Sequence, residues 1–479
     1  MQKKLITHLL SMYIFIIGTS AAAIEVPITI FPLDRYDQNI DHWIKPSDPD
    51  YNQPLIKFSM QKKHLKEYYN RYYATDDNAL SPWSYKHVTT ILNQELKDKI
   101  PQQKKISKYA NPNETDPKKI GYAENFRPHS KQWITDIIAN MNLKQFILPI
   151  KYKSNNRGIA VKNLHARDLP TTDPYFYNFA LAGEGYPFDN LQESSVWVGT
   201  PVYIIGETRD SQWYLILTPH HYIGWVESDG IAKTSPTFIA KWQKYAKQKI
   251  VAITRTNLSI FDKHKQYRFN AYIGTVFPGQ NSAKNTINIL IPIANSYHNA
   301  KITFAKLKSK DATVMPLKAT PHNFATIISG LIGRPYGWGN MYFYNDCSAE
   351  LQSLYAPFGI WLPRNSAAQI KTGKMVDKSS KNIQERLKYL MENGKKFTTI
   401  IYINGHVMLY IGNYPNPNSN THEPIAMTYQ NKWGLKPQDD SYRAVIGQSA
   451  LLPMLTNYPE DPKLNSLAGE KYFQMTYLN

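Results

Sequence analysis

The chain contains one cysteine, Cys347, at a position that suits a nucleophile. It follows the glycine- and aromatic-rich stretch "GWGNMYFYND" and opens the segment "CSAELQSLYAPFG", whose apolar residues recur at helical spacing. Because the N-terminus of a helix stabilises negative charge, we expect a lowered thiol pKa and a larger fraction of the reactive thiolate. The alternative is a buried and inert side chain, the common state of a lone cysteine.

A catalytic thiolate needs a base within hydrogen-bond distance and a third group that orients this base. The best candidate base is His406 in "NGHVMLYIG", because Gly405 before it would let the backbone approach closely. His422, in the polar segment "NPNSNTHEP", is a weaker candidate. For the third group, "AMTYQNKWG" on the next strand offers Gln430 or Asn431, since an amide oxygen accepts from an imidazole N–H. A surface histidine and a solvated glutamine are the alternatives.

Two helices and three strands must position these side chains. "HNFATIISGLIG" predicts an amphipathic helix that ends at Gly333 and Pro335, and the Cys347 segment predicts the second helix. "TTIIYI", "HVMLYIG" and "PIAMTYQ" predict three strands. Helices followed by antiparallel strands indicate an α+β domain that starts at Leu317.

The chain before this domain changes character at about residue 150. Residues 31–150 are polar, tyrosine-rich and helical in pattern, and they predict a helical lobe. Short strands at Val202–Ile205, Trp213–Leu217 and Tyr222–Val226, separated by turn residues, predict a small β-barrel. Residues 250–316 alternate at period two and predict a second barrel.

One segment of the first barrel is irregular, from Arg167 to Ser195. A loop of this length in a small barrel is more often functional than structural.

Composition restricts the class of protein. The 479 residues are 42% hydrophobic, which fits two to four folded domains. The net charge of +19 suits an anionic partner such as nucleic acid, anionic lipid or a wall polymer. No nucleic-acid-binding motif is present, so the sequence predicts no nucleic-acid partner.

The N-terminus predicts export. Lys3 and Lys4, the apolar run Leu5–Ile17 and the small residues Ala21–Ala23 are typical of a cleaved signal peptide. The alternative is an uncleaved membrane anchor, for which the run is short. We expect a periplasmic or secreted protein without a membrane anchor after cleavage. Lone thiols are uncommon outside the cytoplasm, which favours a reactive Cys347.

Several motifs in this order resemble the papain-like cell-wall peptidases of the NlpC family. "RPYGWG", "NDCSAELQ", "LPRNSAAQ" and "GHVMLYIG" resemble the catalytic domain of that family. "FDNLQESSVWVGTPVYIIGETRDSQWYLI" resembles the first bacterial SH3-like barrel of one subgroup, and "SPW" and "AENFRPHSKQW" resemble its N-terminal helical domain.

The resemblance implies a multidomain α+β fold. Its expected parts are a signal peptide (1–23), an N-terminal helical domain (24–150), two small SH3-like β-barrels (151–232 and 233–316) and a papain-like α+β catalytic domain (317–479).

The resemblance also assigns roles to single residues. Cys347 would be the nucleophile, His406 the base, and Gln430 the third member, where many relatives have histidine. Tyr336 would help to hold the oxyanion. The matching substrate-contacting positions are Asp346, Asn365 and Ser366. Relatives that bind a free peptide amine often carry aspartate where Asn365 stands, so amine recognition here would lack that charge.

The activity implied is hydrolysis of peptidoglycan stem peptides or muropeptides between γ-D-glutamate and the following diamino acid. The first barrel would wall off the site, so that a free N-terminal L-alanine is required, and Asp168 and Glu184 would meet the amine. We expect no metal and no cofactor, since no zinc-ligand spacing is present. The alternatives are a non-catalytic wall-binding protein and a papain-like amidase or acyltransferase with another substrate.

Overall fold

The structure, a computed structural model, describes residues 28–95, 101–109, 119–146, 150–179, 181, 183, 185–280, 285–416 and 423–478. The expected signal peptide, Glu184 and His422 lie outside these residues.

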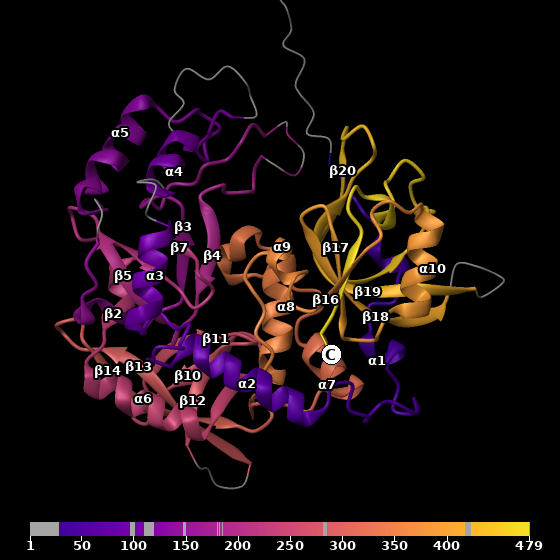
Figure 1. Cartoon of the computed structure of the whole chain (residues 1–479). Coiled ribbons are helices and arrows are strands. Elements are labelled where there is room, and N and C mark those ends of the chain that lie inside the picture. The colour runs from indigo at the N-terminus through magenta and orange to yellow at the C-terminus, as the bar shows by residue number, and fades with distance from the viewer. Residues whose placement is uncertain are drawn as a thin grey trace, which may run out of the picture.

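The C-terminal part is an α+β domain, shown in orange and yellow in Figure 1. Its described strands form a seven-stranded sheet in the order β1-β20-β19-β18-β17-β21-β16. The strands are β1 (Ile28–Ile30), β16 (Lys374–Asp377), β17 (Thr399–Ile403), β18 (His406–Pro415), β19 (Pro424–Leu435), β20 (Arg443–Met454) and β21 (Gln474–Tyr477). The helices are α7 (Pro321–Ser329), α8 (Cys347–Tyr355), α9 (Ser366–Gln369) and α10 (Ile383–Asn393). The predicted helices and strands are confirmed here.

The first barrel precedes this domain. Its strands pair in the order β4-β3-β7-β6-β5-β2-β8. They are β2 (Arg157–Ala160), β3 (Leu164–Arg167), β4 (Gln192–Val196), β5 (Pro201–Glu207), β6 (Trp213–Leu217), β7 (Ile223–Glu227) and β8 (Ile231–Lys233). The irregular segment connects β3 to β4, and a buried ion pair between Arg167 and Asp189 (2.8 Å) holds its two ends together.

The second barrel follows helix α6 (Pro236–Gln248). Its sheet has the order β14-β13-β12-β9-β15, and β10 and β11 form a hairpin beside it. The strands are β9 (Ile250–Ile253), β10 (Leu258–Phe261), β11 (Tyr267–Ala271), β12 (Val276–Gln280), β13 (Thr286–Ala294), β14 (Ala300–Lys308) and β15 (Ala312–Val314).

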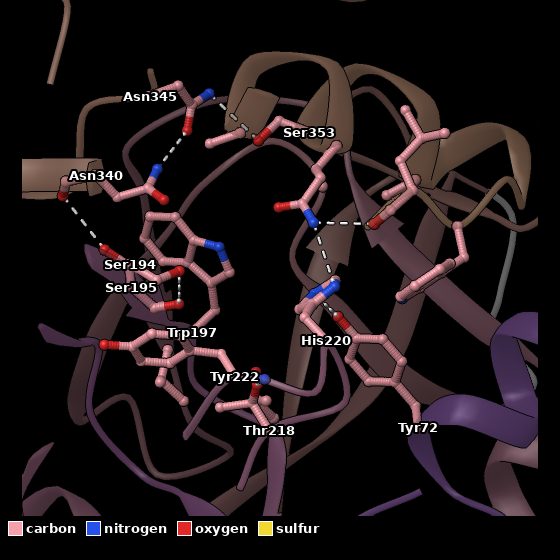
Figure 2. Close-up of a pocket in the computed structure, with 18 of the residues that line it drawn as sticks. Tyr72, Ser194, Ser195, Trp197, Thr218, His220, Tyr222, Asn340, Asn345 and Ser353 are labelled. Carbon is pink, nitrogen blue, oxygen red and sulfur yellow. Dashed lines mark hydrogen bonds between the residues drawn. The ribbon is translucent and has the colours of Figure 1, made fainter. Parts of the chain in front are cut away.

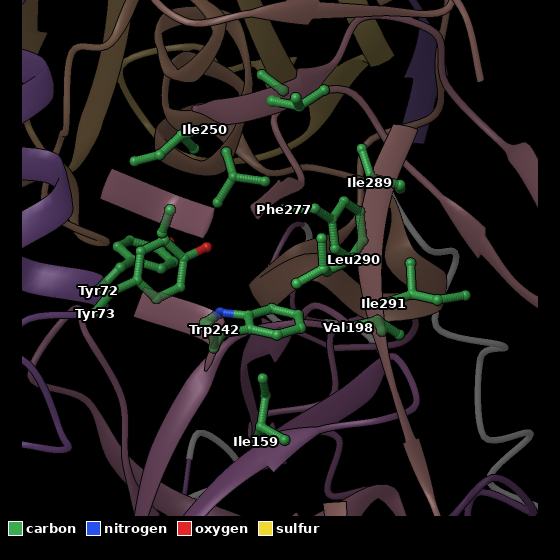
Figure 3. Close-up of a cluster of buried hydrophobic side chains, with 14 of the residues drawn as sticks. Tyr72, Tyr73, Ile159, Val198, Trp242, Ile250, Phe277, Ile289, Leu290 and Ile291 are labelled. Carbon is green, nitrogen blue, oxygen red and sulfur yellow. The ribbon is translucent and has the colours of Figure 1, made fainter. Parts of the chain in front are cut away.

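One continuous core joins the two barrels (Figure 3). Trp242 of α6 and Phe277 of β12 are fully buried in it, and Ile159 and Val198 of the first barrel complete it. Full burial of a large apolar side chain contributes about 1.5–3 kcal/mol, so this shared core fixes one barrel against the other.

The described part of the N-terminal region packs into hydrophobic cores that it shares with the neighbouring domains. β1 pairs in parallel with β20 and extends the C-terminal sheet. Helix α1 (Ile40–Trp43) packs into the core of the same domain, and α2 (Phe58–Tyr72) packs into the core that joins the barrels. The helices that pack against the first barrel are α3 (Tyr85–Glu95), α4 (Pro101–Tyr109) and α5 (Lys131–Asn140).

This arrangement places α8 between the C-terminal sheet and the two barrels, near the middle of Figure 1. The described residues contain no helix that is both long enough and apolar enough to cross a membrane.

Candidate functional site

Cys347 is the first residue of α8, as predicted. Asp346 caps the helix, because its side chain accepts a hydrogen bond from the Ala349 backbone N–H (2.9 Å). Helix α8 packs against β18, and the backbone of Val407, the second residue of β18, is near enough to lower the pKa of the Cys347 thiol. The helix start and the start of β18 therefore meet at Cys347.

His406 stands at the start of β18 because a two-residue turn precedes it. Ile403 of β17 pairs with His406 of β18, and only Asn404 and Gly405 lie between them. Both turn residues have positive φ, +20° and +85°, which is the reason that Asn-Gly is favoured in such hairpins. A Cβ added at Gly405 would meet nothing within 4 Å, so it is the positive φ, and not crowding at the Cβ position, that favours glycine there.

Gln430 of β19 holds the imidazole of His406. Its Oε1 lies 2.8 Å from His406 Nε2, and its Nε2 donates to Thr428 Oγ1 (2.9 Å). Because the amide oxygen can only accept, His406 Nε2 carries a proton and Nδ1 of the neutral ring is free to act as a base. Asn431, the other candidate, faces away and donates to the Asn345 backbone carbonyl (2.8 Å).

The protonation states of Cys347 and His406 differ from those that the sequence predicted. Burial, followed by the charge of Asp346, raises the thiol pKa of Cys347 to about 11, although the Val407 backbone and the Lys432 cation act in the opposite direction. Burial and Lys432 hold the pKa of His406 well below its usual value. The predicted lowered thiol pKa is therefore wrong, because burial outweighs the helix N-terminus. Both groups are neutral at pH 7.

A pocket of about 370 Å³, here named the cysteine pocket, opens beside Cys347. Its lining comes from α8, from the segment before and within α9, and from the first barrel. The lining residues used below are Glu193, His220, Tyr336, Asp346, Cys347, Arg364, Asn365 and Ser366. The sequence-predicted positions Tyr336, Asp346, Asn365 and Ser366 thus lie in one pocket with Cys347.

Arg364 joins the barrel to the helix that carries Cys347. Its guanidinium makes two hydrogen bonds to the Asp346 carboxylate (2.6 and 3.1 Å) and donates to Ser194 Oγ of β4 (2.9 Å). Both side chains of the ion pair are nearly buried, at 12% and 13% exposed. A bidentate pair of this kind fixes geometry as well as charge, so β4 is held against the rim of the pocket.

Tyr336 is covered by the irregular segment of the first barrel. The Phe188 ring lies 6.5 Å from the Tyr336 ring and 4.9 Å from that of Trp433. Burial and the proximity of Cys347 raise the pKa of Tyr336 well above its usual value, so its hydroxyl remains a donor.

The turn after Tyr336 fits closely against β4. Gly339 has a φ of +56°, and a Cβ added to it would lie 2.3 Å from the Gln192 backbone oxygen. The glycine is therefore required, both by its backbone conformation and by this approach.

A separate cavity of about 50 Å³ lies where α2, the first barrel and α8 meet (Figure 2). His220 lies between the Tyr72 hydroxyl and the side-chain amide of Gln352, each 3.2 Å from one ring nitrogen. Burial lowers the pKa of His220 to about 3, so the ring is neutral. Because Gln352 belongs to α8, this contact ties the helix to the barrel.

Of the two acids predicted to meet a substrate amine, Asp168 is not among the described residues that line the cysteine pocket. Its side chain is buried, pairs with Lys105 of α4 (2.7 Å) and accepts a hydrogen bond from the Tyr109 hydroxyl (2.8 Å). Glu184 lies outside the described residues. The acid that does line the pocket is Glu193, the second residue of β4.

Sequence reasoning missed Glu193 and Arg364, although both lie in quoted motifs. Glu193 reaches solvent but stands in a concave site. Burial and the nearby Asp168 raise the pKa of Glu193 to about 7. The signal available for Arg364 was an arginine directly before the predicted contact Asn365. The described residues contain no cluster of three or more His, Cys, Asp or Glu side chains placed to hold a metal ion.

A helix that starts with cysteine and packs on a sheet whose strands supply histidine and glutamine defines a papain-like cysteine-peptidase fold. Four family profiles match the chain in order: the NLPC_P60 stabilising domain, N term (8–146), the SH3 domain of SH3b1 type (174–227), the SH3 domain of SH3b2 type (236–280) and the NlpC/P60 family (333–439). The chain belongs to the NlpC/P60 family, in the form that combines these four domains.

Relatives agree with this assignment. A gamma-D-glutamyl-L-lysine dipeptidyl-peptidase of Bacillus subtilis (strain 168) is 23% identical over 236 residues, which are 47% of this chain and 71% of that protein. The solved structure of an NlpC/P60 endopeptidase from Photobacterium damselae subsp. piscicida is 27% identical, with a TM-score of 0.76, and covers 94% of this chain and 99% of that one.

Proposed function

We propose that the protein is a cysteine peptidase that hydrolyses peptidoglycan stem peptides between γ-D-glutamate and the following diamino acid. The observation that carries the proposal is the hydrogen bond between His406 Nε2 and Gln430 Oε1 (2.8 Å), at the strand end that meets Cys347. The names of the Bacillus subtilis and Photobacterium relatives support the substrate class and the endopeptidase activity.

The reaction would begin from a neutral Cys347 thiol and a neutral His406 imidazole. As Cys347 Sγ attacks the γ-carbonyl carbon, its proton passes to His406 Nδ1, and the carbonyl oxygen becomes an oxyanion. The Tyr336 hydroxyl and the Cys347 backbone N–H, which has no acceptor within the helix, would stabilise this charge.

The second half releases the products. His406 gives its proton to the leaving amine, the C–N bond breaks, and a thioester remains on Cys347. Water then attacks the thioester carbon, its proton passes through His406 to the thiolate, and the γ-carboxyl product leaves. Gln430 keeps the ring oriented throughout, because it accepts from Nε2–H in both protonation states.

Glu193, which lines the cysteine pocket, would bind the free amine of the N-terminal alanine. The Arg364 contacts that hold β4 in place support this role, since they fix the barrel wall beside the substrate. In this arrangement Asn365 adds a neutral contact, and Ser366, whose hydroxyl donates to the Gly405 backbone oxygen (3.1 Å), positions the turn before His406.

The cellular context is part of the proposal. The two SH3 domains support binding to the cell wall, and the N-terminal sequence supports export to the periplasm or the medium. Intact-mass measurement of the exported protein tests the second point, and the expected mass is that of a chain cleaved after Ala21–Ala23.

Mass spectrometry of purified muropeptides and synthetic L-Ala-γ-D-Glu-diamino acid peptides tests the activity. The expected products are L-Ala-D-Glu and the free diamino acid fragment. Cys347→Ala should abolish cleavage while the melting temperature stays that of the wild type. Undiminished cleavage by this variant would overturn the proposal, and wall binding without any cleavage by the wild type would favour a non-catalytic role.

A further inference from the structure

A third cavity, of about 130 Å³, adjoins His406 and is here named the histidine pocket. The residues of its lining that matter here are Asn404, His406, Lys432, Lys436, Asn465 and Glu470. Unlike the cysteine pocket, it receives no residue from either barrel. Lys432 and Gln430 are two residues apart on β19 and thus share one face of the strand, which brings the ammonium beside the imidazole.

Two opposite charges stand in this small space without pairing with each other. The Lys432 ammonium has neither an ion pair nor a hydrogen bond to any described residue, and Glu470 is near enough to act on its charge but too far for an ion pair. Lys436, the other lysine, already pairs with Asp440 (3.1 Å). Unpaired charges in a partly buried pocket are costly, so the site favours a ligand that supplies both counter-charges.

The chemistry of the reaction decides which part of the substrate comes here. Cys347 attacks from the cysteine pocket, so the acyl half of the substrate lies on that side. The leaving amine must lie within reach of His406, which protonates it. The residue that carries this amine therefore enters the pocket that His406 lines.

We propose that the histidine pocket binds the side chain of the leaving diamino acid and selects a zwitterionic end, as in meso-diaminopimelate, over the bare ammonium of L-lysine. This inference rests on the proposed function. Both diamino acids carry an ammonium on the same side-chain carbon, where Glu470 would bind it. Only diaminopimelate adds a carboxylate on that carbon, and Lys432 supplies the matching cation. An L-lysine side chain would leave Lys432 unpaired and would place a second ammonium near it.

Burial lowers the pKa of Lys432 to about 8, with Glu470 and the thiol acting in the opposite direction. The ammonium is thus present at neutral pH but weakly solvated. Such a group gains more from a carboxylate ligand than an exposed lysine does.

Specificity constants for two peptides test the proposal: L-Ala-γ-D-Glu-meso-diaminopimelate and L-Ala-γ-D-Glu-L-Lys. The wild type should prefer the first by about tenfold or more, the effect of one charge-assisted contact. Lys432→Met should bring the ratio of the two specificity constants near one, chiefly by lowering the specificity constant for the diaminopimelate peptide. Glu470→Gln should slow both and keep the ratio. The ratio cancels any effect of Lys432 on Cys347 or His406, because both peptides use the same pair.

Two controls sharpen the result. Lys471→Met removes an exposed charge next to Glu470, outside the pocket lining, and should leave the ratio unchanged. A peptide whose diaminopimelate carboxylate is amidated should behave like the lysine peptide. Equal specificity constants in the wild type, or an unchanged preference in Lys432→Met, would overturn the inference.

A binding measurement separates this inference from the proposed function. Ligand-observed NMR with Cys347→Ala protein should detect free meso-diaminopimelate but not L-lysine, and Lys432→Met should abolish the signal. Such binding without cleavage of any γ-glutamyl bond would reject the proposed function and retain the pocket. Cleavage of both peptides at equal rates, without Lys432-dependent binding, would retain the proposed function and reject the role of the histidine pocket.

Discussion

The two pockets beside Cys347 and His406 differ in which domains build them. The cysteine pocket is shared, since Glu193 and His220 of the first barrel face Asp346 and Arg364 of the C-terminal domain. The histidine pocket belongs to the C-terminal domain alone. A pocket within one domain is set by its own strands, whereas a shared pocket depends on how two domains are held together.

This difference separates two kinds of selection. The barrel can close one end of the cleft and thereby limit the groups attached before the γ-glutamyl residue. Under the proposed function, the sheet and its loops would select the diamino acid on the other side of the scissile bond. Substrate length and diamino acid identity should therefore respond to different substitutions.

The largest expected effect is on substrates blocked at the amine. Acetylation of the N-terminal alanine should lower kcat/KM about 100-fold or more, because it removes the ammonium that Glu193 would bind and adds a group that the barrel wall at β4 would have to accommodate. The measurement compares free and acetylated L-Ala-γ-D-Glu-meso-diaminopimelate. Equal values would show that the cleft is open at that end, and the protein would then act on intact wall.

The next effect comes from breaking the link between barrel and helix. Arg364→Met leaves the nearly buried Asp346 without its partner and should lower the unfolding free energy by about 3 kcal/mol, measured in denaturant. Activity on the free peptide should fall, while discrimination against the acetylated peptide weakens. Adding Asp346→Asn should recover part of the stability. Free diaminopimelate binding should not change, and a loss of it would show that the two pockets are not independent.

Gln430 should affect both pockets alike, since it acts on His406 between them. Gln430→Ala removes one hydrogen bond at a buried imidazole, and about tenfold lower kcat is expected, with the preference between diamino acids unchanged. Gln430→His should keep substantial activity. Full activity of Gln430→Ala would reject the orienting role. Asn431 is a poor substitute because it donates to the Asn345 backbone.

The fold and the Cys347 and His406 positions could be predicted from the sequence because local signals carry them. The helix start at Cys347 has a capping aspartate, and the Asn-Gly turn sets the first residue of β18. The order of the motifs along the chain indicated the remaining domains. These are features of a few consecutive residues, which sequence patterns record well.

Contacts between distant segments could not be predicted in this way. Asp168 of the irregular segment was expected to meet the substrate amine, but it forms an ion pair with Lys105 of α4. The acid that lines the pocket is the nearby Glu193. The thiol pKa was expected to fall at a helix N-terminus, yet burial by the surrounding domains raises it. Both errors concern long-range packing, which decides solvation and pairing.

The smallest expected effect is a pH dependence confined to the cysteine pocket. The groups that face Glu193 are Asp168, which raises its pKa, and Lys105, Lys108 and Arg364, which lower it; with burial as the largest cause, the value is about 7. Below pH 7 the carboxyl is protonated and loses its attraction for the substrate ammonium. Near pH 8 the peptide amine begins to lose its own proton.

KM for the free-amine peptide should therefore be lowest between about pH 7 and 8, and it should rise several-fold on going to pH 6, with little change in kcat. Protonation of His406 does not interfere, because its pKa lies well below this range. In Glu193→Gln the rise of KM toward pH 6 should disappear and the value should stay high throughout. A rise that persists in this variant would assign the titration to another group, and Glu193 would then line the pocket without binding the amine.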